Sequence, residues 1–306
     1  MEPEDFQLTN SSEVPHDVSV TEDFSSMKRA MHAFIMVILI ITCILGVWRN
    51  GLVIWTTDFK LKKSANTVWL LNLAVGDFTF SLLLPLFITY ITLEFNWPFG
   101  RLFCKLTYGV VVLCLHASIF TLATISMDRC VSVVLPIWSR NHRGPRLAAL
   151  LSLGVWIAAT ISSAPSFVFQ QLVAQGNRTQ CSTQYLLEGE RVESLRYPRK
   201  RALTLAHFLL SFLLPLLVIV ISCAIIGLRL RWDHLAPSGS KPFRVMGAII
   251  QAFILCWAPY HVISILVLFH PYDGPWPLVP ISYSLACINS CINPVLYISC
   301  GRTLET

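Results

Sequence analysis

Residues 106–127 read LTYGVVVLCLHASIFTLATISM and contain no Asp, Glu, Lys or Arg. An α-helix of this length would extend about 33 Å, which is enough to cross the hydrocarbon core of a bilayer. Lipid offers no hydrogen-bond partner to backbone N–H and C=O groups, so such a run is expected to be helical in a membrane. The run ends at the adjacent charged residues Asp128 and Arg129. We therefore predict a membrane-spanning helix that reaches water at this pair.

The whole chain has the composition of a membrane protein. Of its 306 residues, 55% are hydrophobic and only 13% are charged, and the mean hydropathy is +0.62. A soluble chain of this length would suggest about two domains, which this composition argues against. Asp, Glu, Lys and Arg are absent from residues 30–48, 65–76, 78–93, 106–127, 147–170, 202–228, 245–270 and 274–301. Because Asp77 merely interrupts one span, the sequence predicts an all-α bundle of seven transmembrane helices within residues 30–300.

The orientation of the bundle follows from modification sites, since Lys and Arg are divided almost evenly between the two sides. Asn10-Ser-Ser and Asn177-Arg-Thr are N-glycosylation sequons, and four predicted spans lie between them, so both can face outside. Cys104 and Cys181 fall in loops of that same side, where oxidising conditions allow a disulfide. We therefore expect the N-terminus outside and the C-terminus in the cytosol.

The segments outside the bundle are predicted to differ in role. Residues 1–29 are rich in acids and poor in apolar side chains, so we expect a disordered extracellular arm, either a solubilising tail or a tether that steers basic partners. The external loop 171–201 ends in RYPRKR, which either anchors a helix end or docks an anionic ligand group. Residues 301–306 form a very short cytoplasmic end. The first span must serve as the insertion signal, because the arm has no cleavable signal pattern.

Asp77 is the only acid deep within a predicted span. A charge within the membrane is costly, so we take this residue as a candidate functional site. Two alternatives are open: a hydrated monovalent cation held by oxygen ligands, or a protonated carboxyl that is simply hydrogen-bonded. Other spans offer polar partners at Asn50, Ser118, Asn289, Ser290 and Asn293. Prolines within three consecutive spans, at Pro215, Pro259 and Pro294, indicate a bundle that moves, because each removes a backbone hydrogen bond.

The pair Asp128 and Arg129 also has two interpretations. It could be a latch, in which Asp128 neutralises Arg129 in one state and releases it in another. It could equally be an ordinary ion pair at the membrane interface.

Motifs in six spans and at the end of another favour the latch. They are Asn50-Gly51, LNLAVGD (71–77), DRC (128–130), Trp156, Pro215, CWAPY (256–260) and NPVLY (293–297). In this order, over nearly all of residues 30–300, they resemble the rhodopsin-like class A of G protein-coupled receptors. A finer similarity, to the chemoattractant branch with the formyl peptide, chemerin and leukocyte prostaglandin D2 receptors, is carried by residues 59–78, NWPFG (96–100), DRCVSVVLPIWSRNHR (128–143) and SKPFRVM (240–246).

The resemblance implies a multi-pass plasma-membrane receptor rather than an enzyme. Its ligand would be an extracellular peptide, protein or lipid mediator, its inner partner a Gi-type heterotrimeric G protein, and no nucleic acid or organic cofactor would be bound. Cys104 and Cys181 would form a disulfide, and Asp77, Ser118 and Asn289 a sodium site. The ligand pocket would comprise Phe87, Tyr108, Val112, Leu115, His116, Arg201, His207, Trp257, Tyr260, His261 and Tyr283. The G protein switch would comprise Asp128, Arg129, Phe253, Trp257, Asn293, Pro294 and Tyr297.

The chain also departs from this pattern. Cys223 stands where the fifth span of relatives has a tyrosine, and His207 stands where several relatives have an arginine for a ligand carboxylate. Arg49, in place of a small residue, would either snorkel toward the inner face or make an ionic contact with a neighbouring span. Relatives continue beyond the position of Thr306 into a tail that arrestins bind once it is phosphorylated, which puts arrestin binding in doubt.

The alternative function is a scavenger or inactive receptor without G protein output. A transporter is disfavoured, since paired intramembrane charges and repeats are not evident.

Overall fold

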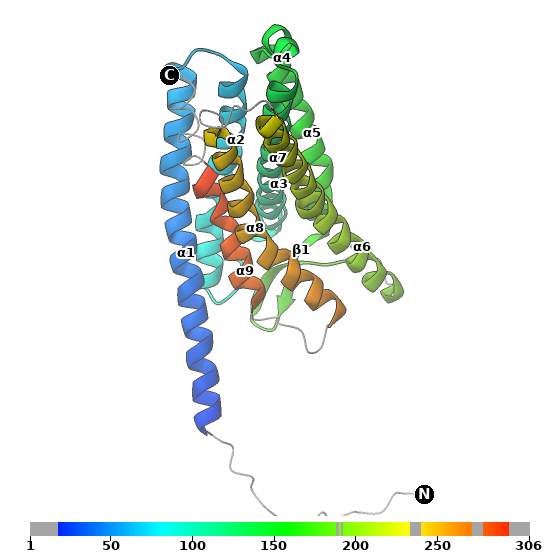
Figure 1. Cartoon of the computed structure of the whole chain (residues 1–306). Coiled ribbons are helices and arrows are strands. Elements are labelled where there is room, and N and C mark those ends of the chain that lie inside the picture. Colours follow the sequence, from blue (N-terminus) through cyan, green and yellow to red (C-terminus); the bar gives the residue numbers. More distant parts are fainter. Residues whose placement is uncertain (1–17, 188–189, 191, 233–239, 271–277, 294–306) are drawn as a thin grey trace, which may run out of the picture.

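The computed structural model describes residues 18–187, 190, 192–232, 240–270 and 278–293. Within these ranges, six helical segments are long and apolar enough to cross a membrane, and a seventh apolar helix covers Leu278–Asn293. The helices lie side by side in one bundle (Figure 1). In chain order they are α1 (Val18–Phe59), α2 (Ala65–Thr92), α3 (Gly100–Val134), α5 (Pro145–Phe169), α6 with α7 (Arg196–Phe208 and Leu214–Trp232), α8 (Ser240–Phe269) and α9 (Leu278–Cys287).

The first helix is longer than the sequence predicted. It begins at Val18, so residues 18–29 lie in α1 and not in a disordered arm. No Gly or Pro occurs between Val18 and Gly46. Extending an existing helix costs far less than starting one, so the apolar span can carry the polar residues before it. The predicted boundary of the arm is corrected accordingly, and the rest of the arm lies outside the described residues.

The fifth span is locally unwound where the sequence contains Pro215. A π-helical turn, η2 (Leu209–Leu213), joins α6 to α7 and directly precedes this proline. Proline has no N–H to donate to the carbonyl four residues earlier, and single π-turns commonly relieve such a break. By contrast, α8 remains helical through Pro259. The π-turn places Ser211, which is fully buried, against the sixth span.

The outer end of the bundle carries a β-hairpin that the sequence did not reveal. Strands β1 (Gln170–Gln175) and β2 (Arg178–Thr183) pair antiparallel, with Gln175 opposite Arg178. Gly176, at the tip, has a φ of 58°, a conformation that glycine adopts without strain. Asn177 is exposed beside it, which leaves the predicted sequon accessible.

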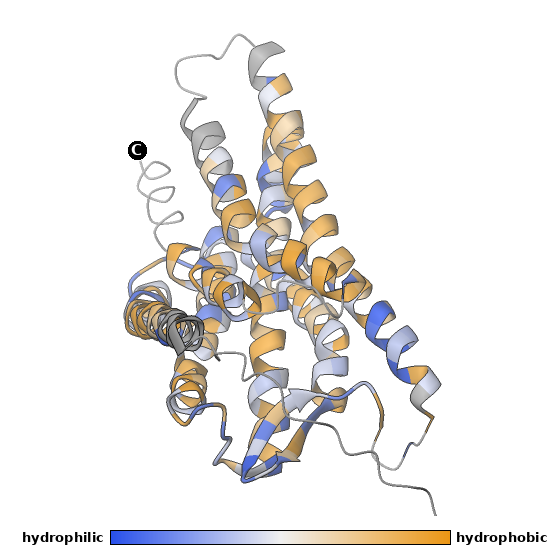
Figure 2. Cartoon of the chain, turned by 90° about the horizontal axis from the view of Figure 1, so that it is seen from below, coloured by the Kyte–Doolittle hydropathy of each residue, from blue (hydrophilic) through white to orange (hydrophobic). Residues whose placement is uncertain are grey.

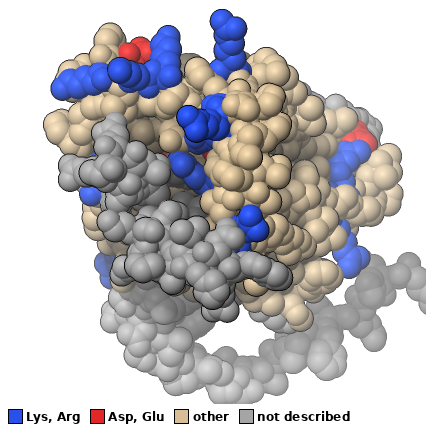
Figure 3. All heavy atoms as spheres, turned by 45° about the horizontal axis from the view of Figure 1, so that its top comes forward, with Lys and Arg blue, Asp and Glu red and all other residues tan. Residues whose placement is uncertain are grey.

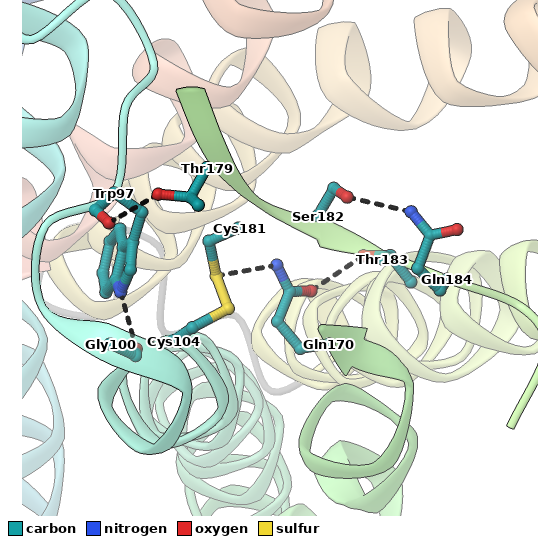
Figure 4. The surroundings of a disulfide bond; sticks show 9 residues. All are labelled: Trp97, Gly100, Cys104, Gln170, Thr179, Cys181, Ser182, Thr183 and Gln184. Atoms are coloured by element: carbon teal, nitrogen blue, oxygen red, sulfur yellow. Dashed lines mark hydrogen bonds between the residues drawn. A yellow bond between two sulfur atoms is a disulfide. The ribbon is translucent and has the colours of Figure 1, made fainter. Parts of the chain in front are cut away.

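A disulfide between Cys104 and Cys181 fastens this hairpin to the start of α3 (Figure 4). Beside it, the Trp97 N–H donates to the Thr179 carbonyl at 2.7 Å, and the indole Nε1 donates to the Gly100 carbonyl at 3.0 Å. Gln170 completes the surroundings by donating to the Cys181 sulfur at 3.3 Å. The disulfide predicted from the resemblance is confirmed, and it fixes the hairpin over the outer end of the bundle.

Hydrophobic residues occur along the helices throughout the bundle (Figure 2), and many large ones are exposed on its outside. Trp48 and Leu255, each 72% exposed, are examples of the outer set. A soluble protein would not leave so many large apolar side chains in water, but lipid is their natural solvent. The interior holds two main apolar clusters, one of them built around Phe253 and Trp257.

Candidate functional site

Aromatic side chains from five helices lie together inside the outer half of the bundle. Phe87 of α2 meets Tyr108 of α3 edge to face, with ring centroids 4.8 Å apart. Tyr260 of α8 contacts both Tyr283 of α9 and His207 of α6, each at 6.0 Å. The structure therefore brings together most of the predicted pocket residues. Leu115 lies at the junction of the two apolar clusters, and Val112 is half-buried one turn above His116.

Arg201 is the predicted pocket residue that the structure places elsewhere. It is exposed, and its guanidinium lies 5.5 Å from the ring centroid of Phe269, at the outer end of α8. A side chain there can meet a ligand on its way in, but it does not line the floor of the pocket.

Three histidines pack together at the inner side of the predicted pocket residues, and we call them the histidine floor. The His207 ring lies 5.3 Å from the His116 ring and 5.4 Å from the His261 ring, centroid to centroid. His261 Nε2 is 3.5 Å from the Ser211 hydroxyl, on the π-turn. His116 is 2% exposed, and the backbone of Val112 is the one group that approaches its ring closely enough for a weak hydrogen bond among the described residues.

Stacked rings lead from this floor toward the cytosol. Phe212 stacks on His261 at 5.0 Å and on Phe253 at 5.9 Å. The Trp257 ring lies beside both His261 and Phe253, with centroid distances of 6.1 Å and 6.4 Å. Both Trp257 and Phe253 are almost fully buried, so a displacement of the histidine rings could not occur without moving these rings too.

Asp77 lies deeper in the bundle and is 3% exposed. Its Oδ1 accepts a hydrogen bond from the Ser118 hydroxyl at 2.6 Å, and its Oδ2 accepts one from the Asn293 amide at 2.9 Å. Asn289 is buried one turn before Asn293, but its amide makes no described hydrogen bond to Asp77. Two of the predicted polar partners thus contact the acid. Oxygen atoms of Asp77 and Ser118 could also serve as ligands for a hard monovalent cation.

Asn50 and Arg49 connect the first span to the seventh. The Asn50 amide donates to the Ser290 carbonyl at 3.1 Å, a carbonyl that Pro294 cannot satisfy because proline has no N–H. Arg49 Nη1 donates to the Cys291 carbonyl at 3.4 Å. Arg49 therefore contacts a neighbouring span, but through a backbone carbonyl and not through the ionic contact that one alternative predicted.

Lys and Arg side chains are spread over the inner end of the bundle, which Figure 3 turns toward the viewer, and one arginine at this end binds Asp128. Its carboxylate accepts three hydrogen bonds from Arg143, two from Nε at 2.8 and 3.0 Å and one from Nη2 at 2.6 Å. Arg129 donates to the Asn66 side chain at 2.9 Å. The structure thus adds Arg143 as a cation for Asp128, and the latch between Asp128 and Arg129 stays a prediction.

Residues 49–297 match the family model described as 7 transmembrane receptor (rhodopsin family). The chain belongs to the rhodopsin family of seven-transmembrane receptors. The predictions of a seven-helix bundle and of a multi-pass membrane receptor are thereby confirmed.

Named relatives of the receptor are chemoattractant receptors. It is 37% identical to chemerin-like receptor 1 of Homo sapiens over 323 residues, covering 100% of this chain and 86% of the relative. It is 35% identical to the C3a anaphylatoxin chemotactic receptor of Danio rerio over 295 residues, covering 94% and 77%. It is 34% identical to N-formyl peptide receptor 3 of Homo sapiens over 277 residues, covering 87% and 78%. The predicted resemblance to the chemoattractant branch is confirmed.

Some functional residues of the receptor were missed from the sequence. Arg143 and Asn66 lie in or beside inner loops, far from Asp128 along the chain, and no spacing rule connects them. Outside, Arg199 donates to Glu190 at 2.7 and 3.1 Å and to the Tyr185 carbonyl at 2.9 Å. The RYPRKR segment thus contains an arginine, Arg199, that holds the external loop through hydrogen bonds. Neither alternative for this segment included that role.

The remaining predicted switch and modification residues, Pro294, Tyr297 and Asn10, lie outside the described residues.

Proposed function

We propose that the receptor binds an extracellular peptide or protein attractant and activates Gi-type heterotrimeric G proteins. The observation that carries this proposal is the continuous set of ring contacts from the histidine floor to Phe253. Because packed side chains have few alternative arrangements, a ligand at the floor can favour one packing of α8 over another. Pro259, two residues before His261 on α8, supplies the weak point about which the inner part of α8 would swing.

The ligand class is inferred from the pocket and from the relatives. The names of the three relatives refer to chemerin, to the C3a anaphylatoxin and to N-formyl peptides. A pocket lined with tyrosine and histidine offers both apolar surface and hydrogen bonds, which suits a peptide end. Val111 is fully buried where amine receptors carry an aspartate, so an amine ligand lacks its counter-ion. A lipid mediator is the second ligand class to test.

Inside the bundle, we propose that Asp77 and Ser118 hold a sodium ion in the resting state, with Asn289 as a further oxygen ligand. The short Asp77 to Ser118 contact supports this role, since it places two oxygens together in a buried position. Sodium should then lower agonist affinity, and Asp77→Asn should remove that sensitivity. Equal agonist affinity in sodium and in choline buffer would favour the simple hydrogen-bonded carboxyl.

Glycosylation at Asn177 and Asn10 is also proposed. Asn177 stands exposed at the tip of the hairpin, where an oligosaccharide meets no described obstacle.

The test is ligand-dependent inhibition of cAMP in cells that display the receptor at a verified surface level. Chemerin, C3a, an N-formyl peptide and a prostaglandin-like carboxylate serve as probes, each with and without pertussis toxin. We expect a toxin-sensitive response to one peptide or protein probe. Trp48→Phe, on the lipid-facing side of α1, is the matched control for Trp257→Phe, which should bind the probe but signal less.

A scavenger receptor remains the competing proposal, and Cys223 is the observation that favours it. The Cys223 thiol is buried in the apolar cluster around Phe253, where a tyrosine would have added a hydroxyl for the active state. Labelled probe that binds and is internalised without any cAMP response would support this alternative. In that case Cys223→Tyr should restore a response.

A further inference from the structure

The short loop between α1 and α2 carries three of the lysines at the inner end of the bundle. Lys60, Lys62 and Lys63 occupy three of four successive positions, and all three are exposed. The loop is cytosolic, because the disulfide between Cys104 and Cys181 marks the opposite end of the bundle as the outside. Within the described ranges, no carboxylate forms an ion pair with any of these lysines. The loop therefore presents uncompensated positive charge to the cytoplasmic leaflet.

Hydrogen bonds hold this loop at both ends. At its start, the N–H groups of Lys60 and Leu61 donate to the Thr56 carbonyl at 3.0 and 3.1 Å, which closes the last turn of α1. At its end, the Ser64 hydroxyl accepts from the Thr67 N–H at 3.3 Å, and the Ser64 N–H donates to the Thr67 hydroxyl at 2.7 Å. Such a capping box fixes the first turn of a helix. The lysines are therefore carried on a backbone whose conformation is defined on both sides.

Beside the loop, α1 turns an apolar face outward. Leu52, Trp55 and Phe59 are 46%, 48% and 76% exposed, and their spacing of three and four residues places them along one side of the helix. The helix lies at the edge of the bundle, where its main contacts are with α2 and α9 (Figure 1). The three side chains therefore face lipid over about 10 Å, or roughly two-thirds of the hydrocarbon depth of one leaflet.

Lys60 joins the basic loop to this apolar face. Its ammonium nitrogen lies 4.3 Å from the centroid of the Trp55 ring, within the range of a cation–π contact. Tryptophan favours the depth of the lipid headgroups, where part of the ring meets water and part meets acyl chains. The contact therefore places a lysine charge at headgroup level, next to a surface that acyl chains can cover.

We propose that this loop, together with the face formed by Leu52, Trp55 and Phe59, binds one phosphoinositide of the cytoplasmic leaflet. The acyl chains lie against the apolar face, and the phosphate groups on the inositol ring accept hydrogen bonds from the three ammonium groups. Three cations at one place suit a headgroup with several phosphates better than phosphatidylserine, which has one net negative charge. Asp58, two residues before Lys60 and exposed, is the acid nearest in sequence and opposes binding. The inference does not depend on the G protein coupling proposed above.

The test measures lipid binding to the purified, detergent-solubilised receptor by native mass spectrometry. The fraction of receptor that carries one phosphatidylinositol bisphosphate, followed over a titration, gives the dissociation constant. We expect binding at least about tenfold tighter than that of phosphatidylserine, since two further charge contacts would already exceed that factor. Each basic residue near a headgroup contributes about a fivefold change in affinity, so Lys62→Gln with Lys63→Gln should weaken binding about 25-fold. Adding Lys60→Gln should bring the loss to about a hundredfold.

Arg140→Gln with Arg146→Gln is the matched control for net charge. Both arginines are exposed at the inner end, on α4 (Pro136–His142) and at the start of α5. This variant removes as many cations as the variant of Lys62 and Lys63, but from other elements. It should leave the dissociation constant unchanged. An equal loss of affinity in the two double variants would show that net charge alone attracts the lipid, and would overturn the inference.

Asp58→Asn tests the same site in the opposite direction. Removing this acid should tighten binding, an effect that a poorly folded variant cannot produce, and unchanged affinity would contradict charge recognition at this loop. Phosphatidylserine that binds as tightly as the phosphoinositide would indicate an unspecific shell of anionic lipid. Inositol trisphosphate, which has the phosphates without acyl chains, should compete only weakly. Competition at the same concentration as the lipid would remove the apolar face from the site and overturn the proposal.

Discussion

Gly109 of α3 lies directly against the ring of Phe167 of α5. A Cβ atom at position 109 would come within 2.2 Å of the Phe167 Cδ1, closer than any non-bonded carbon pair allows. The absence of a side chain at this one position is what allows the third and fourth spans to approach at their outer ends, where the pocket and the disulfide are located.

Replacing Gly109 with alanine should therefore destabilise the receptor. A ring packed between two helices cannot withdraw freely, and overpacking of this kind typically costs about 1–3 kcal/mol. We expect a lower melting temperature of the detergent-solubilised receptor and less of it at the cell surface. Gly154→Ala, on the open face of the same α5, is the control, since its Cβ would meet no atom within 4 Å. Equal melting temperatures for the two variants would show that the Phe167 ring does not restrict the side chain at position 109.

The hydrogen bond from Asn50 to Ser290 should matter for stability as well. Because Pro294 provides no N–H, Asn50→Leu would leave the Ser290 carbonyl unpaired in a buried site, at a cost of about 1–3 kcal/mol. Thr89→Val is the control: its hydroxyl bonds only to its own helix, on an exposed face. A melting temperature for Asn50→Leu as high as that of Thr89→Val would contradict this account.

The disulfide should be needed for binding and not for insertion. In Cys181→Ser the hairpin loses its covalent link to α3, while the helices keep their apolar contacts. We expect a normal amount of inserted receptor and a loss of probe binding. Removing a disulfide that closes a loop of this size commonly costs about 2–5 kcal/mol, which the hairpin alone cannot compensate. Retained affinity, also in the double variant with Cys104→Ser, would show that the hairpin does not shape the pocket.

The external loop should open at acidic pH. The hydrogen bond from Arg199 lowers the pKa of the Glu190 carboxyl, and the Leu187 N–H lowers it further. An acid whose pKa is lowered by folding stabilises the folded loop above its ordinary pKa, near 4.3, and loses that contribution as the pH falls through the lowered value. Hydrogen exchange in the peptide around Leu187, corrected for intrinsic rates, should therefore stay slow at neutral pH and increase only in strong acid.

Glu190→Gln provides the comparison for this loop. Its exchange should already be fast at neutral pH and should vary little with pH, while Arg201→Gln, which alters an arginine outside the contact, should behave like the unaltered receptor. If Glu190→Gln exchanged as slowly as the original, the Arg199 contact would not hold the loop.

The spans could be predicted from the sequence because their signal is local. The length of a run such as 106–127 and its lack of charge are enough to predict a membrane-spanning helix. The ring contacts of the pocket, from His116 to Trp257, were accessible only through the family resemblance, since they join helices far apart along the chain. The Arg143 to Asp128 pair escaped both approaches. Neighbouring charges in a sequence suggest an ion pair, whereas Arg143, which binds Asp128 in the structure, comes from the loop that follows α3.

The hairpin also could not be predicted, for a different reason. Residues 170–175 and 178–183 mix polar and apolar side chains without a clear alternation, because one disulfide and the adjacent helices, and not an apolar face, hold the strands in place. The first span differs from the prediction in the opposite way, because its helix continues beyond the apolar run and begins at Val18.

The most direct test of the central claim uses purified receptor in nanodiscs with purified Gi heterotrimer and measures nucleotide exchange against bound probe. The account predicts that the peptide or protein probe accelerates exchange, and that Trp257→Ala abolishes the acceleration while probe binding remains. Probe that binds with full occupancy yet leaves exchange at its basal rate would contradict the claim that this ring path carries a signal to a G protein.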